Sequence, residues 1–133
     1  MIHTGVANYL LDATALIDYL RGRQGMIELV RALDQQGHRL GVCCITVAEL
    51  YAGLSDEERA GADPLIDAMD NHEVSREIAK ESGRFRYEFA RKGIALSTTD
   101  TLIAATAIAQ DATLITANAK DFPMEEIELL EHS

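Results

Sequence analysis

The sequence has few of the residues that mark a membrane protein, a disulfide-rich protein or a zinc protein. Its 133 residues include no tryptophan, two prolines, two cysteines and four histidines. No apolar run approaches the ~20 residues that span a membrane, and residues 1–7 show no cationic stretch followed by a long apolar one. We therefore expect no membrane span, no signal peptide and a cytoplasmic location.

The few potential sulfur and nitrogen metal ligands are badly placed for a zinc site. The two cysteines, Cys43 and Cys44, are adjacent, and neighbours in a strand point to opposite faces of the sheet. A disulfide between them would be strained, so we interpret both as small, semi-buried core residues. The histidines are scattered along the chain, which excludes the ligand spacing that zinc requires.

Basic residues are scarce relative to acidic ones. The chain has 12 Lys and Arg against 22 Asp and Glu, a formal net charge of −10. This balance argues against a protein whose whole surface attracts nucleic acid or anionic lipid. It does not exclude a nuclease, because bound divalent ions reverse the sign of a local acidic site, and it suits a basic protein partner.

Apolar runs of two periodicities alternate along the chain, and apolar residues make up 47% of it, enough for a core in one domain over residues 1–133. This alternation predicts an α/β fold, with a mostly parallel five-stranded sheet covered by helices on both faces in a three-layer α/β/α sandwich. The predicted strands are 8–12, 39–45, a short one at Glu73–Val74, 113–116 and 127–130. The predicted helices are 14–20, 26–33, 46–54, 55–69, 75–91 and 101–109.

Acidic residues recur where the predicted strands end and helices begin. Asp12 ends the first strand, Glu49 lies in the first turn of the helix after the second, and Asp100 begins the buried helix 101–109. Asn118 and Asp121 follow the fourth strand. Because ligands of open α/β sheets bind beyond the carboxyl ends of the strands, we expect these residues at one functional edge.

Each of these acids also has a structural explanation. Thr46 and Glu49 fit a capping box, as do Ser97 and Asp100. Asp12 could cap the helix that follows it, and the last acid could be an ordinary turn residue. The positions alone leave helix caps and a metal site both open.

The combination of acids favours a cation site. Several carboxylates that converge without a counter-charge repel one another and raise one another's pKa. Such an arrangement is useful when a cation binds there, and Mg²⁺ prefers hard oxygen ligands. Oxygen-bearing side chains are what these positions offer, without the Cys and His of a zinc site.

Four segments resemble, in the same order, the four motifs of PIN-domain proteins. They are residues 9–18 (YLLDATALID), 46–53 (TVAELYAG), 99–107 (TDTLIAATA) and 114–122 (LITANAKDF). The resemblance covers nearly the whole chain, and the subgroup that the segments resemble most is the VapC toxin ribonucleases of toxin–antitoxin pairs.

The resemblance implies a five-stranded parallel sheet with an acidic Mg²⁺ site, where Mn²⁺ is also possible. By it, Asp12, Glu49 and Asp100 are the metal-binding and catalytic acids, and Thr14 supplies a hydroxyl beside the first of them. The fourth position falls to Asn118 or Asp121. Many relatives place an Asp where this chain has Asn118, so the number of bound ions, one or two, is left open. Asp121 matches a further catalytic and metal-binding acid of the family.

The resemblance also implies an activity and partners. It predicts a Mg²⁺-dependent endoribonuclease that hydrolyses RNA phosphodiester bonds as the toxin of a VapBC-type system, with a cognate antitoxin and a homodimeric state. The ion would polarise a phosphoryl oxygen and activate a water. Arg21 and Arg23 are candidates for phosphate contacts, as are the basic residues on or near helix 75–91, namely Arg84, Arg86, Arg91 and Lys92. The alternative for that helix is a solvated face of ion pairs with neighbouring glutamates.

Three other functions share part of this pattern. A non-catalytic PIN-type RNA- or protein-binding module would keep the fold without the chemistry. A haloacid-dehalogenase-type phosphatase needs a second acid where Thr14 stands. A receiver-like signalling domain needs an Asp after a central strand, where this chain has Ile45 and Thr46.

Overall fold

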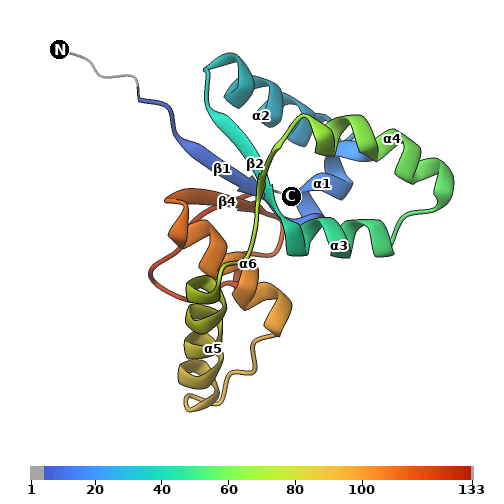
Figure 1. Cartoon of the computed structure of the whole chain (residues 1–133). Coiled ribbons are helices and arrows are strands. Elements are labelled where there is room, and N and C mark those ends of the chain that lie inside the picture. The colour runs from blue at the N-terminus through green and yellow to red at the C-terminus, as the bar shows by residue number, and fades with distance from the viewer. Residues whose placement is uncertain (1–4, 133) are drawn as a thin grey trace.

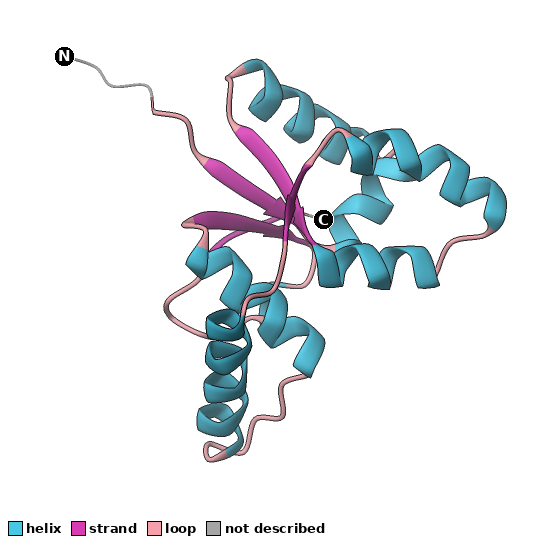
Figure 2. Cartoon of the chain, in the orientation of Figure 1, coloured by secondary structure: helices cyan, strands magenta, loops and turns pink. Residues whose placement is uncertain are grey.

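The protein is described here by a computed structural model that covers residues 5–132. We expect no signal peptide in residues 1–7, and residues 1–4 of this segment lie outside the described range. The described chain forms five strands and six α-helices, with two helices after each of the first three strands (Figures 1 and 2). In chain order they are β1 (Asn8–Leu11), α1 (Ala13–Leu20), α2 (Gln24–Gln35), β2 (Arg39–Cys43), α3 (Cys44–Ala52), α4 (Asp56–Asp67), β3 (Asp70–His72), α5 (Arg76–Ala90), α6 (Thr98–Ala109), β4 (Ala112–Thr116), the short 3₁₀ helix η1 (Ala119–Asp121) and β5 (Glu128–Glu131).

The five strands form one sheet in the order β3-β2-β1-β4-β5, and every pairing between them is parallel. The chain moves outward from β1 to β2 and β3, then crosses back to β4 on the other side of β1. The strand order therefore reverses between β1 and β4, and the carboxyl end of this pair is where open α/β sheets bind ligands.

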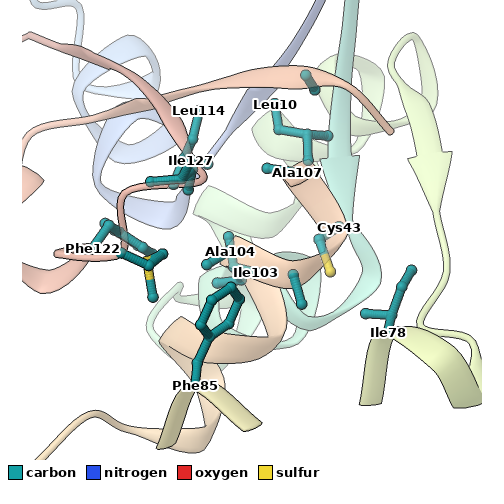
Figure 3. Close-up of a cluster of buried hydrophobic side chains, with 13 residues drawn as sticks. Leu10, Cys43, Ile78, Phe85, Ile103, Ala104, Ala107, Leu114, Phe122 and Ile127 are labelled. Carbon is teal, nitrogen blue, oxygen red and sulfur yellow. The ribbon is translucent and has the colours of Figure 1, made fainter. Parts of the chain in front are cut away.

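Helices cover both faces of the sheet, because alternate strand residues face opposite cores. Leu10 joins a cluster with α5 and α6 that contains Phe85 and Ile103, drawn in Figure 3. Leu11 joins the opposite cluster, where Leu16 of α1 and Val30 of α2 pack. The predicted three-layer α/β/α arrangement is confirmed. In the described residues, no helix is both long and apolar enough to cross a membrane.

Polar side chains fix the starts of several helices. Ser55, Ser75 and Ser97 accept hydrogen bonds from backbone N–H groups in the first turns of α4, α5 and α6. Ser55 forms a full capping box with Glu58. Such caps satisfy backbone donors that have no partner within the helix.

Several predicted boundaries are wrong, and three of them show why. The second strand was expected to reach Ile45, but β2 ends at Cys43 and α3 begins at Cys44. The short strand was expected at Glu73–Val74, but β3 spans Asp70–His72 and pairs with the end of β2. The helix expected over 101–109 begins three residues earlier, at Thr98. In each case pairing or capping in three dimensions overrides the local apolar pattern.

Both cysteines are free, with Cys43 buried and Cys44 half-buried, as predicted. The Cys43 thiol contacts the Thr106 hydroxyl at 3.5 Å.

Candidate functional site

Asp12 lies at the carboxyl end of β1, where it also caps α1. Its side chain is 5% exposed. Oδ1 accepts hydrogen bonds from the Thr14 hydroxyl at 2.6 Å and from the Ala15 N–H at 3.0 Å. Oδ2 accepts one from the Thr116 hydroxyl at 2.6 Å. A carboxylate offers about four acceptor positions, so one position remains, on Oδ2.

The two hydroxyls that hold Asp12 also hold the loop that follows β4. Thr14 Oγ1 accepts a hydrogen bond from the Ala117 N–H at 3.0 Å, and Thr116 Oγ1 accepts one from the Asn118 N–H at 2.9 Å. Thr14 was expected beside the first acid, and it lies there. Thr116 was not anticipated, although the sequence offers a signal: a hydroxyl residue ends a strand that flanks the strand of Asp12.

Glu49 lies in the second turn of α3, not in the first turn as predicted. The residue that caps α3 is Cys43, and the Thr46 hydroxyl is fully buried without a hydrogen-bond partner. The predicted capping box of Thr46 and Glu49 is therefore wrong. Its loss removes the structural explanation for an acid at this position.

The Glu49 carboxylate lies in an acidic environment. Partial burial raises its pKa, and the charges of Asp100 and Asp12 raise it further. Among residues 5–132 no hydrogen bond or ion pair reaches this carboxylate. Like-charged neighbours without a compensating base are the signature expected of a cation-binding acid.

Asp100 is the third residue of α6, and its N–H donates to the Ser97 hydroxyl at 3.0 Å. Burial raises the pKa of the Asp100 carboxyl, a hydrogen bond with Ser97 opposes this shift, and the charges of Asp121 and Asp12 add to it. Of the predicted capping box, the cap by Ser97 is present, but within the described residues the Asp100 side chain does not accept a hydrogen bond from the Ser97 N–H. The carboxylate of Asp100 nevertheless faces other acids.

Acids from four segments thus meet at this edge: the charges of Asp100 and Asp12 act on Glu49, and those of Asp121 and Asp12 act on Asp100. The six salt bridges found within residues 5–132 involve none of them. The described residues also hold no group of three acids, histidines or cysteines at ready-made metal-binding spacing.

The β4–η1 loop carries the two remaining candidates. Asn118 is exposed, and its backbone rather than its side-chain amide makes the contact with Thr116. Asp121 ends η1, is half-buried, and its charge acts on Asp100. That one of the two completes the site stays a prediction. The effect of its charge on Asp100 favours Asp121 over Asn118.

The two candidate phosphate contacts near α1 differ. Arg23 forms a salt bridge with Asp18 at 3.3 Å. Arg21 is exposed at the end of α1 and forms no salt bridge within the described chain. On α5, Arg84 pairs with Glu81, Glu88 and Glu126, the solvated ion-pair face that was the alternative there.

A cavity of about 550 Å³ lies between α5 and α6, with an apolar floor that includes Ile78 and Phe85. None of the four acids lines it. Glu49 itself is exposed and Asp100 half-buried, so the acids occupy an open edge of the sheet rather than that cavity. An open edge suits a long polymer better than a small molecule.

The donor chemistry of the site fits a hard divalent ion. Asp12, Glu49 and Asp100 could supply the ligands, all of them oxygen atoms, and such ligands suit Mg²⁺ and Mn²⁺ better than zinc. Asp12 has one acceptor position left, and the charges of Glu49 and Asp100 are not compensated by a base within the described residues. A bound cation would use the first and balance the second.

Comparisons with known proteins identify the family of the chain. The family model of the PIN domain matches residues 9–124. Ribonuclease VapC19 from Mycobacterium tuberculosis is 36% identical over 117 residues, which cover 86% of this chain and 92% of the relative. Ribonuclease VapC2 from Rickettsia felis is 29% identical, with coverage of 86% and 89%.

Solved structures share the fold. The crystal structure of VapBC2 from Rickettsia felis bound to a DNA fragment from its promoter superposes with a TM-score of 0.86 at 23% identity, covering 95% of this chain and 99% of that one. VapBC from Salmonella typhimurium, also bound to DNA, superposes with a TM-score of 0.82, also at 23% identity, with coverage of 95% and 98%. From the family match and the identity to VapC ribonucleases, we conclude that the chain belongs to the PIN domain family.

Proposed function

We propose that the protein is a Mg²⁺-dependent endoribonuclease, able to use Mn²⁺, that acts as the toxin of a VapBC-type pair. The observation that carries this proposal is the carboxylate of Asp12, fixed by three donors at the point where the strand order reverses. It keeps one acceptor position beside Glu49 and Asp100, whose pKa values are raised. The identity to two named VapC ribonucleases supports the RNA substrate.

Each acid has a role that follows from its surroundings. Asp12 is rigid and buried, so it is the group best placed to fix the position of the ion. Lewis-acid activation of the phosphodiester and of water is the chemistry that a bound divalent ion would supply. Glu49 is exposed and lies beside the charges of Asp100 and Asp12, so it could share the ion or orient the attacking water.

The remaining residues bind or position the RNA. Asp100 shares the ion with Asp12, and Asp121 or Asn118 completes the pocket on the side of η1. Arg21 is the better candidate near α1 for a phosphate contact, because it forms no salt bridge within the described chain, whereas Arg23 is paired with Asp18. Single-stranded or looped RNA is the expected substrate form.

The biological setting follows from the relatives. Several structural neighbours are toxin–antitoxin complexes, among them one from Klebsiella pneumoniae at 26% identity and a TM-score of 0.72. We propose that this chain likewise binds a cognate antitoxin and forms a homodimer in the cytoplasm. Its charge of −10 favours a basic segment in that partner.

One experiment separates the enzyme from a non-catalytic PIN-type module. Total cellular RNA is incubated with the wild-type protein in Mg²⁺ and in a chelator, and with the Asp12→Asn variant in Mg²⁺, and the new RNA ends are mapped. The proposal predicts new ends only for the wild type in Mg²⁺. Cleavage that survives in the chelator or in Asp12→Asn would reject the assigned mechanism, and no cleavage in any arm would favour a binding module.

The partnership is tested separately. The chain is purified alone and together with the product of the adjacent gene, and both the stoichiometry and the cleavage rate are measured. We expect a stable complex with lower activity. Separate elution of the two proteins with unchanged activity would contradict the toxin–antitoxin assignment without affecting the nuclease.

A further inference from the structure

We propose that Thr116 is a positioning residue of the acidic site, an inference that rests on the proposed metal-dependent function. Its hydroxyl contacts both the Asp12 carboxylate, at 2.6 Å, and the Asn118 N–H, at 2.9 Å. One side chain therefore links the principal acid to the loop that carries Asn118 and Asp121. The residues that form the link are 104 positions apart in the sequence.

The direction of each hydrogen bond is fixed by chemistry. A backbone N–H can only donate, so the Thr116 oxygen must accept from Asn118. The single hydroxyl proton of Thr116 is then directed at Asp12 Oδ2. Thr14 repeats the pattern, because it accepts from Ala117 and donates to Oδ1. Both hydroxyls therefore act as donors to an acceptor carboxylate.

The two threonines are not equivalent in what they support. Oδ1 has a second donor, the Ala15 N–H, so it stays anchored without Thr14. Oδ2 has Thr116 as its one donor among residues 5–132, and it is the oxygen with a position left for a cation. Thr116 is fully buried, so water cannot easily replace its hydroxyl. The orientation of the cation-binding oxygen therefore depends on Thr116 more than on Thr14.

The sheet explains why a hydroxyl residue stands there. Leu11 of β1 is in register with Ile115 of β4, and the Asp12 N–H donates to the Ile115 carbonyl at 3.1 Å. The next residue of β4 is Thr116, directly beside Asp12. The contact thus lies where the strand order reverses, and the rigid core of the sheet sets its geometry.

The test measures Mn²⁺ binding rather than activity alone. The full-length protein is titrated with Mn²⁺, and the free ion is followed by electron paramagnetic resonance. Thr116→Val keeps the shape but leaves Oδ2 without a donor and the Asn118 N–H without an acceptor. Loss of a group that orients a metal ligand typically costs about 10- to 100-fold in affinity, and we expect a weakening in that range.

Three further variants isolate the cause. Thr116→Ser keeps the hydroxyl and should bind Mn²⁺ within about twofold of the wild type. Thr14→Val should weaken binding less than Thr116→Val. The matched control is Thr106→Val, which removes another fully buried hydroxyl, one that donates to the Leu102 carbonyl at 2.8 Å and touches none of the acids. This control should lower stability without changing Mn²⁺ affinity.

The outcomes distinguish this inference from the proposed function. No Mn²⁺ binding by the wild type would overturn the metal site itself. Wild-type binding with equal affinity in a folded Thr116→Val variant would overturn only the role of Thr116. A folded Thr116→Ser variant with lost affinity would assign the effect to packing and also refute the inference. If Thr116→Val does not fold, Thr116→Ala takes its place with the same expected weakening.

Discussion

Substitutions of two site acids should change stability in opposite directions while both abolish cleavage. Asp12 is buried and accepts three hydrogen bonds, whereas Glu49 is exposed, accepts none within the described residues and faces like charges. Asp12→Asn should therefore destabilise the protein, and Glu49→Gln should stabilise it. A shared loss of activity through general unfolding would not produce this division.

The magnitude for Asp12→Asn follows from its partners. Hydrogen bonds to a charged group contribute about 1.5–3 kcal/mol each and neutral ones about 0.5–1.5 kcal/mol. In the asparagine variant the carbonyl still serves Thr14 and Ala15, but an amide nitrogen faces the Thr116 hydroxyl. Weakening all three bonds costs about 2–4 kcal/mol. A domain stability of about 5–15 kcal/mol leaves the variant folded, with a Tm lower by about 10 °C.

The sign for Glu49→Gln follows from its pKa. A carboxyl whose pKa is raised by folding binds protons more tightly in the folded state, so its charged form opposes folding at neutral pH. Glutamine does not titrate and removes that penalty. The expected gain is small, because Glu49 is exposed and solvent screens its charge.

The assay is thermal unfolding by circular dichroism in a chelator, repeated in Mg²⁺, alongside RNA cleavage. We expect Mg²⁺ to raise the Tm of the wild type and to leave that of Asp12→Asn unchanged, because a ligand stabilises only the state that binds it. A stabilised Asp12→Asn variant, or a Glu49→Gln variant as destabilised as Asp12→Asn, would refute the reasoning.

Three further predictions concern titration, RNA contacts and the core. Because the pKa values of Glu49 and Asp100 are raised, the wild type in a chelator should lose stability as the pH rises from their usual values of 4.5 and 3.8. Thermal unfolding across pH should show a flatter profile for the double variant Glu49→Gln/Asp100→Asn, and an unchanged profile would contradict the shifts. In filter-binding titrations, Arg21→Ala should weaken RNA binding and lower the slope of log K against log salt concentration by about 0.7. The control Arg84→Ala removes a charge that is already paired and should leave this slope unchanged. Equal slopes for Arg21→Ala and the wild type would exclude Arg21 as a contact. Phe85→Ala should lower the free energy of unfolding by about 3–5 kcal/mol, because Phe85 is 1% exposed in the core between α5 and α6. A loss under about 1 kcal/mol in urea unfolding would contradict the packing.

The sequence predicted the layered fold because apolar periodicity records which faces are buried. It failed where local pattern and three-dimensional pairing disagree. The run from Arg39 to Ile45 reads as one strand, yet its last two residues begin α3. The polar β3 carries little apolar signal, and it is placed by pairing with β2. At that contact Gly41 leaves room for β3, because a Cβ atom there would lie 2.8 Å from the His72 ring and 3.0 Å from the Asp70 carbonyl oxygen.

The candidate site was predictable as a set of acids but not as a network. The positions of Asp12 and Asp100 follow from where a strand ends and where a capped helix begins. Glu49 was assigned to the wrong turn because the boundary of α3 was wrong. The role of Thr116 depends on the register between β1 and β4. A single sequence does not show this register, because Asp12 and Thr116 are 104 positions apart.

The central claim is that Asp12, Glu49 and Asp100 bind one divalent ion. Diffraction from crystals grown with Mn²⁺, recorded at the manganese absorption edge, tests it most directly. The account predicts an anomalous peak bonded to Asp12 Oδ2, with oxygens of the other two acids among its neighbours. A map with no peak at this edge of the sheet, and with the three side chains turned apart, would contradict it.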